Sequence, residues 1–191
     1  MTTATTSPAP ASDSVPATRW TLDPAHTNVL FTVRHMMISN VRGEFGKVTG
    51  EVAFDPSRPE QARLTATIDV ASINTREEKR DAHLRSPDFL DVEKYPTIAF
   101  ASKAVRRHGD GYEVTGDLTI HGTTREIALT VEDVTAEHKD PWGNTRVGAS
   151  ARTKIKRSDF GMQWNAALEL GGVLVGDEVS IHIDAELIKA Q

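Results

Sequence analysis

The side chains best suited to catalysis or metal binding in this chain are seven histidines, and no cysteine accompanies them. The lack of cysteine excludes a disulfide framework, a thiolate zinc site and a cysteine nucleophile. No two histidines have the H-x-H or i,i+4 spacing that brings two rings to one metal ion. His35 and His83 each lie in a segment of concentrated charge, but the sequence does not place partners for them. We therefore expect no metal site and no cofactor.

Short motifs of common enzyme classes are also missing. The chain contains no G-x-S-x-G, no phosphate-binding P-loop, no G-x-G-x-x-G after a strand and no H-E-x-x-H. We therefore predict that the protein is not an enzyme and has no catalytic residues.

Two polar segments remain as candidates for binding. One is Arg80–His83, and the other is the loop Arg157–Asn165, which mixes charge with aromatic side chains. In a structural interpretation, Asp81 and Arg85 form an i,i+4 ion pair on a helix and Asp159 caps a turn. In a functional interpretation, arginine and tryptophan at the mouth of a cavity hold a polar head group.

Length and composition limit the number of domains and the possible classes of function. The chain has 191 residues, with 22 Lys and Arg against 27 Asp and Glu, so its formal net charge is −5. This length suits one domain with a real core. The mild acidity argues against nucleic-acid binding, which needs a basic face. No run approaches the ~20 apolar residues that cross a bilayer, so we expect no spanning helix.

The first 18 residues differ from the rest of the chain. Thr, Ser, Pro and Ala supply 15 of them, which leaves almost nothing to bury and predicts a disordered tail. The segment lacks the positive start and apolar run of a signal peptide, so we expect a cytoplasmic protein. The folded domain is predicted to span 19–191.

Strict alternation of apolar and polar residues dominates the remaining chain. It is clearest in Arg63–Val70, Tyr112–Ile120, Val147–Ile155 and Val179–Leu187. A period of two with one polar face is typical of antiparallel, half-buried strands. Weaker candidates for strands are Arg19–Asp23, Thr27–His35, Glu44–Phe54, Pro96–Val105 and Arg125–Val134.

Short turns and one helix connect these strands. His108–Gly111 and His121–Thr124 are predicted hairpin connections, and Asp140–Asn144 a longer turn. Thr75 and Glu78 have the spacing of a capping box, which predicts a helix that must end before Pro87. Seven of the ten residues from 76 to 85 are charged, so this helix covers an end or edge of the sheet rather than filling the core.

Eight or nine alternating strands with meander turns favour an all-β, closed up-and-down barrel. An eight-stranded barrel is just wide enough to fill with side chains or to hold one small ligand. The predicted inner face is rich in small residues, which suits a hollow interior, yet packed barrels also alternate small and large side chains. Composition leaves both interiors open.

Seven segments, in order along the chain, resemble the YceI-like family. The resemblance implies a lipocalin-like barrel of eight antiparallel strands that binds a polyisoprenoid lipid, such as a quinone tail or a polyprenyl phosphate. It also implies that the chain can form homodimers, and many members of this family are exported. The segments are Trp20–His26, Phe31–Met36, Arg42–Phe45, Arg80–Leu84, Pro87–Pro96, Gly116–Gly122 and Asp159–Met162.

From this resemblance and the alternation together, we nominate ligand contacts. Candidates for the head group are His35, Arg80 and Arg157, although the pattern Arg80–Leu84 could equally hold the helix on the barrel. The rival hypothesis is an enzyme or stress-response factor that uses His35 and Asp81 on a lipid head group. The nominated apolar contacts along the lumen are Phe31, Val33, Phe45, Val48, Val52, Leu64, Ile68, Phe89, Phe100, Leu118, Ile120, Ala149, Ala151, Trp164, Ile181 and Ile183.

Overall fold

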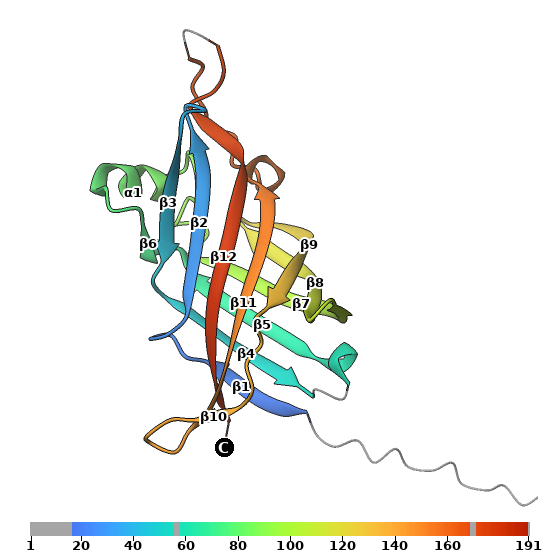
Figure 1. Ribbon diagram of the computed structural model, residues 1–191. Helices are drawn as coiled ribbons and strands as arrows, with labels where there is room; N and C mark the ends of the chain where they lie inside the picture. Colours follow the sequence, from blue (N-terminus) through green and yellow to red (C-terminus); the bar gives the residue numbers. More distant parts are fainter. Residues whose placement is uncertain (1–16, 56–57, 169–170, 191) are drawn as a thin grey trace, which may run out of the picture.

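The computed structural model of the protein describes residues 17–55, 58–168 and 171–190. Within them, one sheet curls round on itself and carries a single α-helix on its outside near one end (Figure 1). Most of the predicted tail lies outside the described residues. Thr18, which we had assigned to that tail, is the first residue of β1 and pairs with Phe54.

The described elements are twelve strand segments, one α-helix and three short 3₁₀ turns. In chain order the strands are β1 (Thr18–Leu22), β2 (Asn28–His35), β3 (Ser39–Phe45), β4 (Val48–Phe54), β5 (Arg63–Asp69), β6 (Ile73–Asn74), β7 (Thr97–His108), β8 (Gly111–Ile120), β9 (Thr123–Glu132), β10 (His138–Lys139), β11 (Thr145–Lys156) and β12 (Val175–Lys189). The helix is α1 (Glu78–Arg85), and the 3₁₀ turns are η1 (Pro59–Gln61), η2 (Val70–Ser72) and η3 (Arg157–Phe160).

The twelve strand segments make eight barrel strands, because each of the first three barrel strands consists of two segments: β1 with β2, β3 with β4, and β5 with β6. β1 and β2 pair with successive stretches of β12, and β4 and β3 pair with β1 and β2 in turn. β5 and β6 continue the same pattern on β4 and β3. With β7, β8, β9, β11 and β12 this gives eight strands, and β10 adds a short arm to β11.

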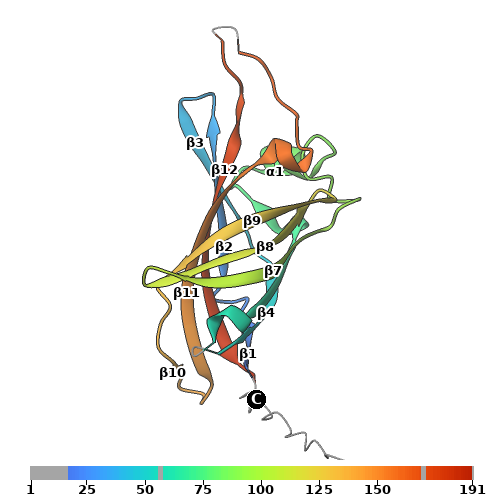
Figure 2. The same cartoon turned by 90° about the vertical axis from the view of Figure 1, so that its right-hand side faces the viewer.

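The barrel closes between its last strand and its first. β12 pairs with β11 along one edge, from Arg146↔Ile188 to Lys156↔Glu178, and with β1 and β2 along the other. All neighbours are antiparallel and follow the chain order, as the meander turns predicted (Figure 2). The shortest junction in the ring joins β9 to β11 by three residue pairs, from Ser150↔Glu132 to Arg152↔Thr130.

Alternation places the apolar side chains inside, as predicted. Val114, Leu118 and Ile120 on β8 are buried, and the alternate residues Thr115, Asp117 and Thr119 are more exposed. Gly116 shares their face, but the Phe100 ring occupies the space next to it, since a Cβ there would lie 2.6 Å from Phe100 Cζ. Gly116 is one of the small inward residues that suit a hollow lumen, but the Phe100 ring, and not open space, lies beside it.

The helix ends as predicted but begins differently. Ser86 caps its C-terminus just before Pro87. Its N-cap is Glu77, whose carboxylate accepts from the backbone N–H groups of Lys79 and Arg80, so the predicted capping box at Thr75 is wrong. Thr75 lies one turn earlier and is buried. No helix among the described residues is long and apolar enough to cross a membrane.

The two hairpin connections predicted at His108–Gly111 and His121–Thr124 are confirmed, and their loops are the two-residue stretches Gly109-Asp110 and His121-Gly122. His121 and Gly122 both have positive φ (51° and 69°), as tight hairpin turns require. A third hairpin, Met36–Ile38 between β2 and β3, was not predicted, because its apolar residues carry no turn signal. The single strand predicted over Glu44–Phe54 is instead the end of β3 and all of β4.

Candidate functional site

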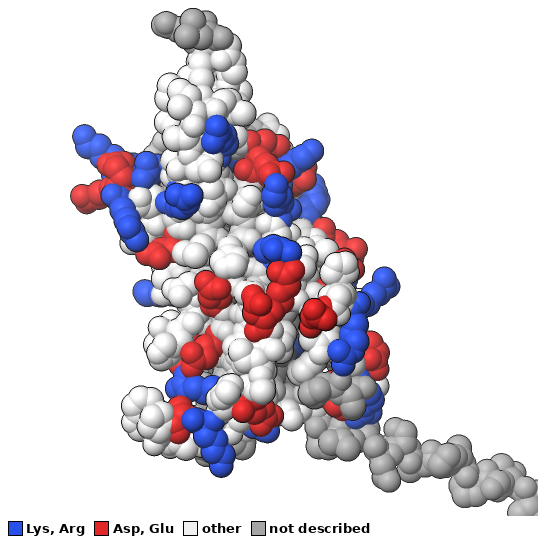
Figure 3. Space-filling model, in the orientation of Figure 1, with Lys and Arg blue, Asp and Glu red and all other residues white. Residues whose placement is uncertain are grey.

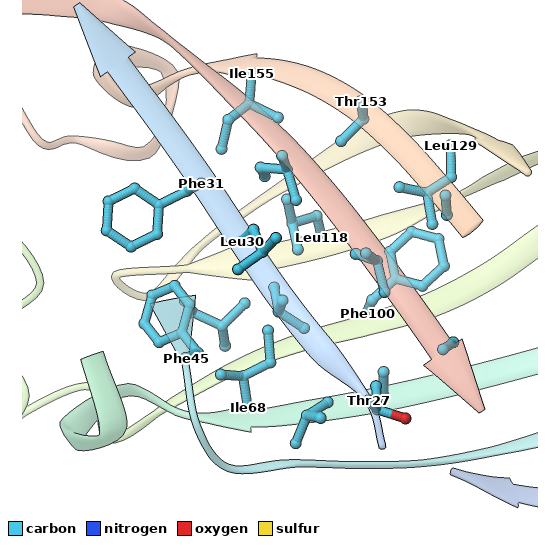
Figure 4. Close-up of a pocket in the computed structure, with 18 of the residues that line it drawn as sticks. Thr27, Leu30, Phe31, Phe45, Ile68, Phe100, Leu118, Leu129, Thr153 and Ile155 are labelled. Carbon is cyan, nitrogen blue, oxygen red and sulfur yellow. The ribbon is translucent and has the colours of Figure 1, made fainter. Parts of the chain in front are cut away.

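A cavity of about 850 Å³ runs through the barrel, so the interior is hollow rather than packed. Its volume lies within the ~300–1,000 Å³ of typical ligand pockets. The wall consists almost entirely of aliphatic and aromatic side chains, including Phe31, Phe45, Ile68 and Phe100 (Figure 4). Water in such a space finds few hydrogen-bond partners, so the cavity suits an apolar guest.

All sixteen nominated lumen residues line this cavity. Alternation alone found those on the clearest strands, for example Ile181 and Ile183 on β12. Several residues on the weaker strand patterns were missed, although the same period of two could have found them. They include Val29, Ile98, Val105 and Leu129.

One end of the cavity lies beside α1, and we call it the helix end. An aromatic cluster borders it: the His83 ring stands edge-on to Phe89 at 5.0 Å and to Trp164 at 4.7 Å between ring centroids. Phe89 and Trp164 also contact each other, at 5.2 Å. His83 Nε2 lies 2.8 Å from an Asp88 carboxylate oxygen, which orients the ring.

Buried polar contacts hold α1 against the barrel. The Asp81 carboxylate accepts from the backbone N–H and the hydroxyl of Thr75, and both residues are buried. Arg80 Nε donates to the Thr75 hydroxyl (2.7 Å) and Arg80 Nη2 to the Thr75 carbonyl (2.8 Å). Since Asp81 is buried and one of its oxygens accepts both bonds from Thr75, this geometry does not favour the rival hypothesis of Asp81 acting on a head group.

The predicted pair of Asp81 and Arg85 does not form. Arg85 instead donates through Nε to the Ala71 carbonyl (3.1 Å) and through Nη2 to the Ile73 carbonyl (2.6 Å). Ala71 lies in η2, between β5 and β6, and Ile73 is the first residue of β6. Arg85 is thus a second attachment of the helix.

Arg157 lines the cavity, but its guanidinium is committed to the backbone. It donates to the carbonyls of Met162, Trp164, Val175 and Gly176, and it is 6% exposed. Burial lowers the pKa of Arg157, and Asp177 partly offsets this effect. Arg157 therefore holds the loop that carries Trp164, and we do not assign it to a head group.

Basic side chains gather at the helix end of the cavity. Arg34, His35, Lys79, Arg80 and His83 all line it. Among the described residues that line the cavity, the one carboxylate is Glu137, on the segment after β9 at the opposite end of the barrel. Lys79 and Arg34 were not nominated from the sequence, because nothing in their spacing shows that they face a cavity.

An ion-pair cluster lies near the C-terminus, at the end of the barrel away from α1 (Figure 1). Asp23, His26 and Glu186 have donor atoms close enough to hold a metal ion, but Arg146 Nη1 bonds the carboxylates of both Asp23 and Glu186. A guanidinium thus supplies the positive charge there. Hydrogen bonds from His26 and then Arg146 lower the pKa of Asp23 to about 2.

These features define a class: a closed, eight-stranded antiparallel barrel with an apolar cavity that is polar at one end. The family model of the YceI-like domain matches residues 20–187, and the chain belongs to that family. Protein YceI of Escherichia coli O157:H7 is 38% identical over 161 residues, which is 84% of this chain and 81% of the relative.

Solved structures agree with this assignment. BcnA of Burkholderia cenocepacia matches with a TM-score of 0.75 and 28% identity, over 86% of this chain and 98% of BcnA. A polyisoprenoid binding domain from Saccharophagus degradans, implicated in plant cell wall breakdown, matches with a TM-score of 0.64. At 15% identity, over 90% of this chain and 98% of that domain, this second likeness shows the shared fold.

Proposed function

We propose that the protein binds a polyisoprenoid lipid, with the prenyl tail along the barrel cavity and the head group at the helix end. The observation that carries the proposal is the continuous apolar wall of a cavity of about 850 Å³. The fold shared with a polyisoprenoid binding domain supports the same class of ligand. The protein then acts as a carrier or a store, without chemistry on the lipid.

Tail burial accounts for most of the expected affinity. Each five-carbon prenyl unit contributes roughly 3–4 kcal/mol gross, at about 0.8 kcal/mol per buried methylene. A solvent-exposed ion pair at the head group contributes about 0–1 kcal/mol. Association and ordering costs greatly reduce the net contribution of the tail, but the tail still contributes more than the head group.

The charges at the helix end favour an anionic head group over a neutral one. Lys79, Arg80 and His35 line that end without a carboxylate beside them in the described cavity wall. Arg80 uses two nitrogens to hold Thr75, and its Nη1 has no hydrogen bond within the described residues. We therefore propose a polyprenyl phosphate as a better ligand than a quinone with the same tail.

Organic extraction of the purified protein, followed by mass spectrometry, tests the ligand class. We expect a long-chain isoprenoid. Recovery of ordinary phospholipid only, or of nothing even after incubation with an isoprenoid, would contradict the proposal.

Titration of the intrinsic tryptophan fluorescence with octaprenyl phosphate and with ubiquinone of the same eight-unit tail tests the head group. We expect tighter binding of the phosphate, and Lys79→Gln should weaken the phosphate but not the quinone. Lys103→Gln, at an exposed ion pair on β7, is the matched control. Equal affinity for both lipids would overturn the assignment of the head group while leaving the tail site intact.

A further inference from the structure

The hairpin between β2 and β3 exposes an unusual group of apolar side chains. Met36, Met37 and Ile38 are 38%, 57% and 76% exposed, and Val173 on the neighbouring loop is 39% exposed. These four residues, which we call the apolar tip, make up four of the six large hydrophobic residues that are exposed in the described chain. The other two, Val134 and Trp142, lie elsewhere on the barrel.

Backbone contacts hold the apolar tip together. The Met36 N–H donates to the Leu174 carbonyl (2.8 Å), and the Ile38 N–H donates to the His35 carbonyl (3.0 Å). Met36 and Met37 both have positive φ, at 50° and 59°, where glycine or asparagine is usual. Two methionines are therefore held in a turn geometry that suits them poorly, with their side chains outside the core.

The apolar tip projects beyond the helix end of the barrel (Figures 1 and 2). His35 and Leu174, the chain neighbours of Met36 and Val173, both line the cavity, so the tip continues the rim of its helix end. Arg34 donates to the Met37 carbonyl (2.9 Å), which places a cation at the base of the tip. On the face shown in Figure 3, the described part of this projection is white, and Lys, Arg, Asp and Glu side chains lie lower down, over the body of the barrel.

We propose that the apolar tip inserts into the interface of a lipid bilayer and holds the helix end of the cavity against the membrane. Apolar side chains on a projecting loop gain burial among acyl chains, and Arg34 at the base of the tip, with Lys79 in the wall of the cavity, suits the phosphates of anionic lipids. The inference rests on the proposed function, because a bilayer is where a polyisoprenoid cargo resides.

A second copy of the chain fits this surface less well. A stable protein interface uses about 20–30 residues a side, far more than the four side chains of the apolar tip. A bilayer needs no complementary partner surface, and a narrow projection can enter it.

Co-sedimentation with vesicles tests the proposal. The vesicles contain phosphatidylcholine with or without three-tenths phosphatidylglycerol. We expect the intact protein to bind, more tightly with the anionic lipid, and Met37→Ser/Ile38→Ser to lower the partition coefficient at least about tenfold. Trp142→Ser, which removes an 82% exposed tryptophan from the β10–β11 hairpin at the opposite end, is the matched control and should bind normally.

Three outcomes would overturn the proposal: the intact protein fails to bind vesicles, the double variant binds equally well, or Trp142→Ser loses as much binding. Sedimentation velocity adds a fourth, since a dimer that the double variant abolishes would assign the tip to a second copy. Thermal unfolding checks that the variants fold.

Uptake of octaprenyl phosphate from detergent micelles separates this inference from the proposed function. The double variant should take up lipid normally from micelles and slowly from vesicles. Failure of the intact protein to take up lipid from either source, with vesicle binding intact, would defeat the proposed function and leave membrane docking in place.

Discussion

At the scale of single residues, Ala151 distinguishes a ligand-filled cavity from a packed core. Its side chain lines the cavity, between the strand partners Val131 and Ile183. Overpacking of a filled core costs about 1–3 kcal/mol. We therefore expect Ala151→Leu to change the stability of the lipid-free protein by less than this, while uptake of octaprenyl phosphate falls. Urea unfolding and lipid titration on the same preparation measure both. A strongly destabilised variant with normal uptake would contradict the assignment of Ala151 to the binding site.

The cluster around Arg146 gives a prediction for acid stability. The pKa of folded Asp23 is about 2, below its ordinary value of 3.8, so its contribution is complete above about pH 4 and is lost as the pH falls toward 2. Arg146→Gln should bring the Asp23 pKa closer to its ordinary value and flatten the fall in stability between pH 4 and 2. The facing groups are His26, Glu186 and, through Arg146 Nε, Asp140.

Urea unfolding at several pH values measures this difference. Arg152→Gln, on the same strand as Arg146, is the control, because the ion pair of Arg152 with Glu132 on β9 is largely exposed. Parallel pH profiles for the intact protein and Arg146→Gln would show that the cluster does not set the acid response.

At the scale of elements, the buried carboxylate of Asp81 is one of the attachments that hold α1 to the barrel. Asp81→Ala leaves the Thr75 N–H and hydroxyl without their acceptor, which should cost about 1–3 kcal/mol. Because α1 borders the helix end of the cavity, we also expect faster release of bound lipid. Stopped-flow displacement and urea unfolding measure the two effects. Glu78→Gln, an exposed change on the same helix, should alter neither, and unchanged release in Asp81→Ala would show that α1 does not cover the ligand.

The strands show how much of the fold the sequence predicts. Alternation is local, so it identified β5, β8, β11 and β12 and their inward faces. The breaks in the first three strands depend on pairing with β12 and its neighbours, and a local pattern does not contain that pairing. The Met36–Ile38 hairpin was missed for a related reason, because its residues have no intrinsic preference for a turn.

The candidate site divides in the same way. Its apolar wall follows from alternation, whereas the roles of its polar residues follow from tertiary contacts. Arg80, Asp81 and Arg157 are residue types suited to binding a head group. In the structure, however, Arg80 and Asp81 hydrogen-bond to Thr75, and Arg157 hydrogen-bonds to backbone carbonyls such as that of Met162. Lys79 was overlooked in the sequence, although it lines the cavity.

At the scale of the whole molecule, charge and hydrophobicity are distributed unevenly between the two ends of the barrel. The formal net charge is −5, yet the helix end of the cavity is lined by Arg34, Lys79 and Arg80 and continues into the apolar tip. The opposite end carries Glu137 and the Arg146 cluster. This polarity gives the barrel one end suited to meeting an anionic lipid and one end tied by ion pairs.

Lipid binding in the cavity should therefore stabilise the whole barrel, and the prenyl tail should contribute more of this stabilisation than the head group. At a free concentration of 100 times Kd, a ligand adds about 2.7 kcal/mol to the free energy of unfolding. For a chain of this size, that corresponds to a rise in Tm of roughly 5–10 °C. Differential scanning calorimetry with geranylgeranyl phosphate should show this rise, whereas isopentenyl phosphate at the same concentration should leave Tm unchanged, because it buries one prenyl unit in place of four. An equal rise with both compounds would mean that the head group, and not the apolar cavity, carries the affinity.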